Sequence, residues 1–404
     1  MSRVRSVEVE SLFDSRARAT VEATVELESG AKGRAGAPSG ASTGATEVRA
    51  FPVGGVPEAL ATARSRVVPV LIGRDARDQA GFDRALHEVD GTPDFSRIGG
   101  NMATALSVAV ATAVAAEDGR ALWQVIARPG VDGRDFPSIV GNCMNGGAHA
   151  IGGPEFQEFI AVAESPDPRQ SVAAAIRVHG LIGEALHRRL PTIALGRGDE
   201  GGWVAPLGNV EALEVLVDAC AAARDELHIA VHPGVDLAAS EFYRDGKYRY
   251  RDRALDAEAQ IAHVSELVDR FGIRYLEDPL DQTSFDGFAD VTRAVGSKAL
   301  VVGDDIYTTD VRRVAEGVAR GSSNAVLVKV NQVGTLTDTA ATVDYCRSHQ
   351  LATVTSHRSG EVPEGWLAHV ALGTGARALK CGVVGGERVA KLNELLRLRR
   401  ATPR

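Results

Sequence analysis

A regular series of ionisable side chains at the ends of short apolar runs constrains the fold of this chain most strongly. In the second half of the sequence, apolar runs alternate with helical patterns, and consecutive end residues lie 23 to 41 residues apart. That distance is about the length of one β/α unit with its return. We therefore predict a β/α barrel, in which the carboxyl ends of the strands converge on one active site. The six end residues are Asp236, Glu277, Asp304, Lys329, His357 and Lys380.

The first part of the chain has a different pattern. The stretches "VEVESLF" and "ATVEATVELES" alternate in polarity and predict strands, whereas helical patterns dominate from about Pro57 to Ile126. Pro, Gly and Asp gather in "ARPGVDGRDFP", residues 127–137, which predicts a linker. The expected fold class is α/β, with an N-terminal α+β capping domain over residues 1–127 and a barrel catalytic domain over residues 128–404.

The composition favours a globular protein that acts on a small molecule. The chain has 404 residues, 44% of them apolar, and a formal net charge of −8 with mixed signs, so we expect neither a nucleic-acid nor a membrane partner. The apolar stretch from Met102 reaches charged residues before the ~20 residues that a bilayer requires, and predicts a buried helix. The N-terminus has no secretory pattern and the four cysteines are scattered, so we expect a cytoplasmic protein.

Three of the strand-end residues are carboxylates. Asp236, Glu277 and Asp304 would repel one another at one barrel mouth unless a cation neutralised them, and oxygen ligands suit Mg²⁺. A single such carboxylate more often caps a helix or stays solvated, but three at successive strand ends favour a metal site. Lys329 is a candidate general base whose pKa burial and nearby cations would lower. The alternative is a lysine with a packed stem and a solvated head.

Loops rich in glycine carry further candidates. "GRGDEGGW" leaves the carboxylates of Asp199 and Glu200 accessible, and "NGGAHAIGGPEFQEF" places His149 and Glu158 around a turn. Either loop could equally be an ordinary turn, and "PSGASTG" could bind phosphate through N–H groups or be a flexible loop. The strand "ATVTS" ends in "HRSG", which places a histidine, an arginine and a serine side by side at the expected barrel mouth.

These segments together resemble the enolase family, from about Val7 to Leu398 and in unbroken order. The matching stretches are "PSGASTG", "NGGAHA", "QEF", "GDEGG", "ASEFY" with "GKY", "LEDP", "VGDD", "VKVNQVG", "SHRSGE" and "ERVAKLNELLR". The resemblance implies an N-terminal α+β domain packed on a modified (β/α)8 TIM-type barrel of the enolase superfamily, which opens in the order ββαα. It also implies a homodimer or a higher homo-oligomer.

The resemblance implies a Mg²⁺-dependent hydro-lyase that converts 2-phosphoglycerate to phosphoenolpyruvate. Lys329 falls on the base that takes the α-proton, Glu200 on the acid that protonates the departing hydroxyl, and Glu158 on its support. Two Mg²⁺ ions are expected, the second binding with the substrate. Their expected ligands are Asp236, Glu277 and Asp304 for the tighter ion and Ser42 for the second. The expected substrate-binding residues are His149, His357, Arg358, Ser359, Lys380 and Ser42.

Three stretches depart from the family pattern. The usual "DSRGNPT" is "DSRARAT" here, the usual "SHRSGETEDT" is "SHRSGEVPEG", and the usual "KTGAP" followed by "SERLAK" is "KCGVVGGERVAK". The last two changes border the expected phosphate and carboxylate sites.

Three interpretations follow. The first is ordinary enolase activity. The second is the same elimination on a phosphonylated hydroxy acid, as performed by the enolase-like dehydratase that makes carboxyphosphonoenolpyruvate. The third is a non-catalytic, enolase-like binding scaffold. The retained base and carboxylates favour an enzyme, and the retained phosphate and carboxylate contacts favour the first interpretation.

Overall fold

An antiparallel sheet of three strands begins the chain in the computed structural model, which describes residues 2–41 and 43–401. Its strands β1 (Val4–Phe13), β2 (Ala19–Leu27) and β3 (Lys32–Gly36) are neighbours in sequence order. Alternate residues of β2, among them Val21 and Val25, are fully buried, because the period of two turns one face of the sheet toward helix α4 (Gly100–Asp118). The two predicted strand segments are thereby confirmed as β1 and β2.

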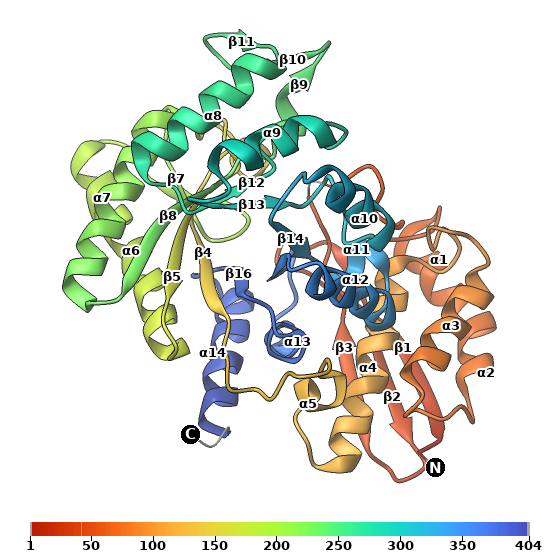
Figure 1. Ribbon diagram of the computed structural model, residues 1–404. Helices are drawn as coiled ribbons and strands as arrows, with labels where there is room; N and C mark the ends of the chain where they lie inside the picture. Colours follow the sequence, from red (N-terminus) through yellow and green to blue (C-terminus); the bar gives the residue numbers. More distant parts are fainter. Residues whose placement is uncertain (1, 42, 402–404) are drawn as a thin grey trace.

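Helix α4 is the apolar segment that begins near Met102, and it is buried along nearly all of its length. The small alanines let the sheet approach closely, and this part of the molecule lies beside the barrel in Figure 1. Among residues 2–41 and 43–401, the structure has no helix that combines the length and apolarity needed to cross a membrane. The other helical segments of this part are α1 (Gly55–Thr62), a π-helical turn (Ala63–Val67), α2 (Val68–Leu71), α3 (Gln79–Asp90) and α5 (Leu122–Ile126).

Residues 127–137 contain neither helix nor strand and lead into a closed barrel. The barrel closes where its last strand pairs in parallel with its first. The second strand runs antiparallel to both of its neighbours, whereas the other pairings are parallel. The barrel strands are β4 (Ser138–Asn145), β5 (Glu158–Glu164), β8 (Ala230–Asp236), β12 (Tyr275–Glu277), β13 (Leu300–Gly303), β14 (Ala325–Val328), β15 (Ala352–Ser356) and β16 (Ala378–Gly382).

The barrel opens with two strands and then two helices, which confirms the ββαα order expected from the family resemblance. Short strands and turns decorate the loops: β6 (Gly196–Arg197), β7 (Trp203–Val204), β9 (Tyr243–Arg244), β10 (Lys247–Arg249), β11 (Ala254–Leu255) and two 3₁₀ turns (Gly147–His149 and Ala239–Phe242). The helices are α6 (Pro168–Arg189), α7 (Asn209–Leu227), α8 (Ala257–Phe271), α9 (Phe285–Val295), α10 (Val311–Arg320), α11 (Val330–Val333), α12 (Leu336–Ser348), α13 (Trp366–Thr374) and α14 (Gly386–Ala401).

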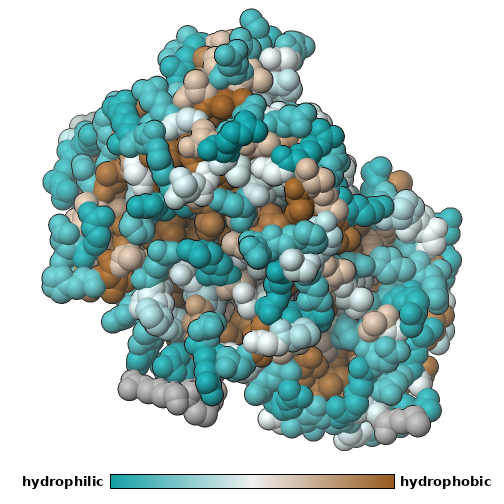
Figure 2. Space-filling view, in the orientation of Figure 1, coloured by the Kyte–Doolittle hydropathy of each residue, from teal (hydrophilic) through white to brown (hydrophobic). Residues whose placement is uncertain are grey.

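Apolar side chains fill the barrel interior and the layer between its strands and the outer helices. The interior cluster is small and consists largely of β-branched and aliphatic residues, as expected for a packed barrel core. On the face drawn in Figure 2, the outer surface is mostly hydrophilic, and hydrophobic residues lie mainly in the recesses. The interior cluster comprises Val140, Ile160, Val162, Tyr275, Val302, Ala325, Leu327, Val354 and Ala378.

The turn between β1 and β2 stores backbone strain. Ala17 has a φ of 55°, in the left-handed region that side chains with a Cβ rarely adopt, and it stands where the enolase pattern has Gly. The Asp14 carboxylate accepts the backbone N–H groups of Arg16 and Arg18 and so holds the turn in place. The altered "DSRARAT" sequence therefore forms a tight turn at the cost of one strained residue.

We expect Ala17→Gly to raise the free energy of unfolding by about 0.5–1 kcal/mol. The left-handed conformation costs a residue with a Cβ roughly 1–2 kcal/mol, which exceeds the extra chain entropy that Gly loses on folding. As a control, Ala19→Gly lies in strand β2 without such strain and should lower stability. Urea titrations would measure both variants, and a loss of stability in Ala17→Gly would contradict the strain argument.

Candidate active site

The strand-end residues predicted from the sequence meet at the carboxyl end of the barrel. Asp236 and Glu277 end β8 and β12 and lie opposite each other in the parallel register. Both side chains are buried. The others occupy the following strands in turn: Asp304 directly after β13, Lys329 directly after β14, His357 directly after β15 and Lys380 within β16.

Lys380 lies among three buried carboxylates. Its Nζ is 3.0 Å from Asp236 Oδ2, 2.7 Å from Glu277 Oε2 and 3.2 Å from Glu158 Oε1. Burial and the nearby Asp236 carboxylate raise the pKa of Glu277 to about 8, although Lys380 acts in the opposite direction. This end of the barrel therefore carries more buried negative charge than one ammonium group neutralises, which is a condition that favours binding of a cation.

Lys329 forms an ion pair that the sequence did not reveal. Its Nζ lies 2.5 Å from Asp304 Oδ2, and the other oxygen of Asp304 accepts a hydrogen bond from Gln332 at 2.9 Å. Burial acts to lower the pKa of Lys329, but the Asp304 carboxylate outweighs it and the net shift is upward. The predicted lowering of the Lys329 pKa is thus wrong for this arrangement, because the nearest charge is a carboxylate rather than a cation.

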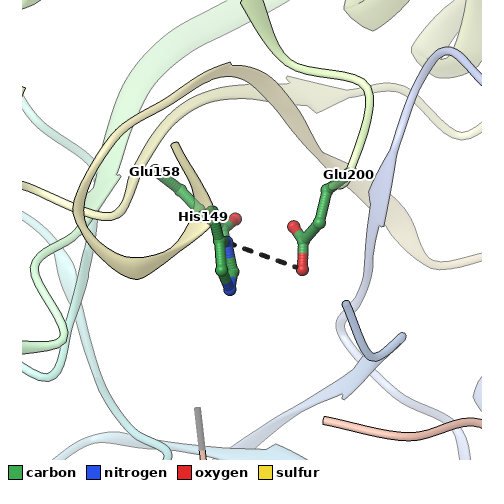
Figure 3. A group of neighbouring side chains, drawn as sticks. All are labelled: His149, Glu158 and Glu200. Atoms are coloured by element: carbon green, nitrogen blue, oxygen red, sulfur yellow. Dashed lines mark ion pairs between the residues drawn. The ribbon is translucent and has the colours of Figure 1, made fainter. Parts of the chain in front are cut away.

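A histidine and two glutamates form a second group of ionisable side chains (Figure 3). His149 comes from the 3₁₀ turn Gly147–His149, Glu158 opens β5, and Glu200 lies between β6 and β7. His149 Nδ1 is 3.8 Å from Glu200 Oε1 and 4.0 Å from Glu158 Oε1. Burial and the charge of Glu200 raise the pKa of Glu158 well above its ordinary value. Burial also raises the pKa of Glu200, but His357 and His149 more than offset this and the net shift is downward.

The predicted phosphate-binding residues lie at the same mouth, but the arginine fork is already engaged. Arg358 Nη2 donates to both carboxylate oxygens of Glu47, at 3.1 and 2.9 Å, and its Nη1 donates to Asn331 at 2.8 Å. Ser359 Oγ accepts a hydrogen bond from Arg16 at 3.4 Å. Ser42, expected to close over the substrate and join the second metal ion, lies outside the described residues.

One cavity brings most of the candidates together. It is small, with a volume of about 20 Å³, and its exposed lining is predominantly polar. Glu277 and Asp304 are not lining residues, but they accept hydrogen bonds from Lys380 and Lys329, which line the cavity. The lining residues are Gly40, His149, Gln157, Glu158, Glu200, Asp236, Lys329, Ser356, His357, Arg358, Ser359 and Lys380.

Comparison with protein families matches both parts of the chain. The model described as "Enolase, N-terminal domain" matches residues 4–126, and the model described as "Enolase, C-terminal TIM barrel domain" matches residues 135–402. The chain belongs to the enolase family. Its predicted fold, an α+β part followed by a modified barrel of the enolase superfamily, is thereby confirmed.

Curated relatives named "Enolase" match over nearly the full length. The relative from Natronomonas pharaonis is 41% identical over 400 residues, which cover 98% of this chain and 99% of the relative. The relative from Methanothermobacter thermautotrophicus is 42% identical, covering 100% and 97% of the two chains. That from Picrophilus torridus is 40% identical and covers 98% of each.

Among residues 2–41 and 43–401, two groups of ionisable side chains have possible metal-ligand atoms that all lie within 4.8 Å of one another. One is His149, Glu158 and Glu200, and the other is Asp278, Asp304 and Asp305. The predicted metal ligands therefore share only Asp304 with these groups, because Asp236 and Glu277 are turned to Lys380. Asp278 was missed, although it directly follows Glu277 in "LEDP"; its oxygens accept the backbone N–H groups of Asp304 and Asp305.

Other residues of the site were missed because their contacts join distant parts of the chain. Glu47 and Arg16 come from the N-terminal part, and Arg388 comes from the first turn of α14. The sequence offered one signal for Arg388, since "ERVAK" was among the stretches that carry the family resemblance. It offered no signal for the pairing of Glu47 with Arg358.

The residues that differ from the family pattern are not among the residues that line the cavity, although unchanged residues of the same stretches do line it. Val362 is fully buried near Gly36, and Glu364 accepts the backbone N–H of Gly36, so the altered "EVPEG" contacts the N-terminal sheet. Cys381 is buried in the barrel wall, where its thiol contacts the carbonyl of Arg388. These changes alter packing around the site, while the cavity keeps the side chains named above.

Proposed function

We propose that this member of the enolase family removes water from 2-phosphoglycerate to give phosphoenolpyruvate. The observation that carries the proposal is the placement of Lys329 and Glu200, one a base and the other an acid, on the lining of one buried polar cavity. An α-proton and a β-hydroxyl are attached to adjacent carbons, so their removal requires a base and an acid that face the same small substrate.

We assign proton abstraction to Lys329. Its neutral amine would take the α-proton, leaving an enediolate with two negative charges on the former carboxylate. Lys380 and the buried cationic groups around the cavity stabilise this charge where it develops. For Lys329 to be neutral, Asp304 must give up part of its interaction with the amine, since the carboxylate is what raises the pKa of Lys329.

We assign protonation of the leaving hydroxyl to Glu200, with Glu158 and His149 as its neighbours. When the enediolate collapses, the C–O bond breaks, its electron pair leaves with oxygen, and the proton from Glu200 completes a water molecule. The buried position of Glu200 favours the protonated acid, whereas a positive charge on His357 or His149 opposes it. The protonation state of these histidines therefore controls how well Glu200 serves as the acid.

We propose that Asp236, Glu277 and Asp304 hold one Mg²⁺ ion and that Ser42 takes part in binding a second. The three carboxylates fit the ion because they are buried, supply only oxygen ligands and come from three successive strand ends. Their charge is only partly balanced by Lys380 and Lys329, whose ammonium groups would yield to a divalent cation. Bound Mg²⁺ would supply the positive charge that an enediolate requires.

We propose that Arg358, Ser359 and Ser42 bind the phosphate, and that His149, His357 and Lys380 lie near the substrate carboxylate and leaving hydroxyl. The partner is then a small phosphorylated hydroxy acid. Neither a phosphonate substrate nor a non-catalytic scaffold gains support, because the substituted residues do not line the cavity and the curated relatives described above are named "Enolase".

We expect Asp304→Asn to weaken Mg²⁺ binding by about tenfold or more, since the neutral amide removes one of three charged ligands. Isothermal titration calorimetry of the folded variant with Mg²⁺ measures the effect. Asp310→Asn is a matched control, because Asp310 only begins helix α10 and pairs with Arg312. Equal Mg²⁺ affinity in Asp304→Asn and wild type would contradict the three-carboxylate assignment.

The proposed activity is tested by the rise in ultraviolet absorbance when protein and Mg²⁺ are mixed with 2-phosphoglycerate. Formation of phosphoenolpyruvate supports the proposal, whereas a folded, Mg²⁺-binding protein without turnover would overturn it. A parallel assay with a phosphonate analogue tests the second interpretation.

We also propose that the domains divide at residues 127 and 128, that the protein is cytoplasmic, and that it forms a homodimer or a higher homo-oligomer. The separate family matches to residues 4–126 and 135–402 support the division. The four cysteines are unpaired and buried, which suits a reducing compartment. The oligomer rests on the family alone, and sedimentation of the purified protein would test it.

A further inference from the structure

Arg388 is a fully buried arginine that the mechanism above does not use. It lies in the first turn of α14, and its guanidinium reaches the loops that follow β15 and β6. Nη1 donates to the carbonyl of Arg358 at 2.5 Å, and Nη2 donates to the carbonyls of Asp199 and Ser359 at 3.0 and 2.6 Å. Three backbone carbonyls thus accept hydrogen bonds from this one side chain.

The same guanidinium also faces His357, and this contact determines where the imidazole proton lies. Arg388 Nη1 is 2.8 Å from His357 Nδ1, and the backbone N–H of Gly382 donates to the same nitrogen at 3.3 Å. A guanidinium group has donors only, so Nδ1 must act as the acceptor. An imidazole whose Nδ1 accepts is neutral and carries its proton on Nε2, which lies 3.1 Å from Glu200 Oε2.

We propose that Arg388 is a positioning residue that fixes His357 as the neutral tautomer with its proton on Nε2, the nitrogen that lies 3.1 Å from Glu200 Oε2. The role rests on the proposed function, in which Glu200 is the acid. A neutral His357 adds no positive charge beside Glu200, so burial can favour the protonated carboxylic acid that elimination needs. A His357 cation would instead hold Glu200 as a carboxylate and leave no proton for the departing hydroxyl.

The groups around His357 support this account. Burial lowers the pKa of His357 to about 4, Arg388 acts in the same direction, and Glu200 opposes them. Glu361 also faces the imidazole, but its charge is balanced by Lys391 at 2.7 Å. Arg358 follows His357 in the chain, and the carbonyl of Lys380 accepts the backbone N–H of His357; both residues are cations, so they do not favour a positive charge on the ring.

The first test measures the tautomer directly in the wild-type protein and does not depend on activity. ¹⁵N NMR of labelled histidine, assigned by comparison with His357→Asn, should show Nδ1 unprotonated and Nε2 protonated between about pH 6 and pH 8. A protonated Nδ1 in this range would overturn the proposal, even if the protein is an active enolase. The expected spectrum would support it even if 2-phosphoglycerate were not the substrate.

The second test separates positioning from packing. In Arg388→Met, the acid limb of the pH profile for elimination should move upward by about one pH unit, because His357 protonates more easily once the cation is gone. In Arg388→Lys, an ammonium donor remains and the limb should stay near the wild-type position. Exchange of the substrate α-proton depends on Lys329 and should keep its wild-type pH profile in both variants.

A merely structural role predicts a different outcome. Arg388→Met would then depress elimination and α-proton exchange alike, at every pH, and that result would overturn the proposal. Arg313→Lys is the matched control, since Arg313 also donates to two backbone carbonyls, those of Ile306 and Gln282, but contacts no histidine. If Arg388→Met does not fold, the NMR measurement on the wild type decides.

Discussion

Lys329→Ala should lower kcat for 2-phosphoglycerate by about 10³-fold or more, because the variant lacks the proposed general base. Among the described residues, no other lysine or histidine pairs with Asp304 in the way that Lys329 does. The variant should also fail to exchange the α-proton. Its Mg²⁺ affinity should stay close to that of the wild type, since the amine is not a metal ligand. Substrate deuterated at the α-carbon, followed by NMR in Mg²⁺ buffer, measures exchange without requiring elimination.

A lysine elsewhere on the barrel provides the control for Lys329→Ala. Lys298 is exposed and pairs with Asp269 at 2.5 Å, so Lys298→Ala removes a lysine–aspartate ion pair that does not line the cavity and should leave both reactions unchanged. Exchange at the wild-type rate in Lys329→Ala would remove Lys329 from the role of base. Another residue that lines the cavity would then have to be the general base.

Glu200→Gln should stop elimination, by about 10²–10⁴-fold, while leaving exchange of the α-proton nearly intact. The amide keeps the shape of the side chain and its contact with Asn142, at 2.8 Å in the wild type, but has no acidic proton to give to the departing hydroxyl. The measurement pairs the absorbance assay for phosphoenolpyruvate with the deuterium assay on the same preparation.

The division of labour between acid and base makes this prediction specific. Equal loss of both reactions in Glu200→Gln would mean that Glu200 positions the whole substrate rather than protonating the leaving hydroxyl. Glu164→Gln is a suitable control, because Glu164 lies at the far end of β5 from Glu158 and pairs with the exposed Arg377. That variant should retain wild-type values in both assays.

Much of the fold followed from local patterns in the sequence. The ionisable residues at strand ends predicted the barrel because strand length and return length are set by local geometry. The alternating polarity of the β2 residues and the run of small apolar residues in α4 likewise predicted which residues are buried. The order of the barrel's opening strands did not follow from such patterns and came only with the family resemblance.

The site was predictable in its membership but not in its pairings. Glycine loops and strand ends carry most of the residues that line the cavity, and the family resemblance implied that His149, Glu200 and Lys380 share one site, where the structure places them. It could not indicate that Arg358 would meet Glu47, 311 residues away in the chain, or that Asp304 would raise the pKa of Lys329. Coulombic shifts depend on distances of a few ångströms, which the spacing of residues in a sequence does not fix.

The sequence by itself determined which chemical groups this protein has at its barrel mouth, because side-chain type and strand periodicity are local properties. Only the tertiary structure decided their protonation states. Lys329 is held as a cation by Asp304, and His357 is held neutral by the donors that reach its Nδ1. Those states follow from burial and from contacts between elements distant in the chain, and folding alone brings such elements within hydrogen-bonding range.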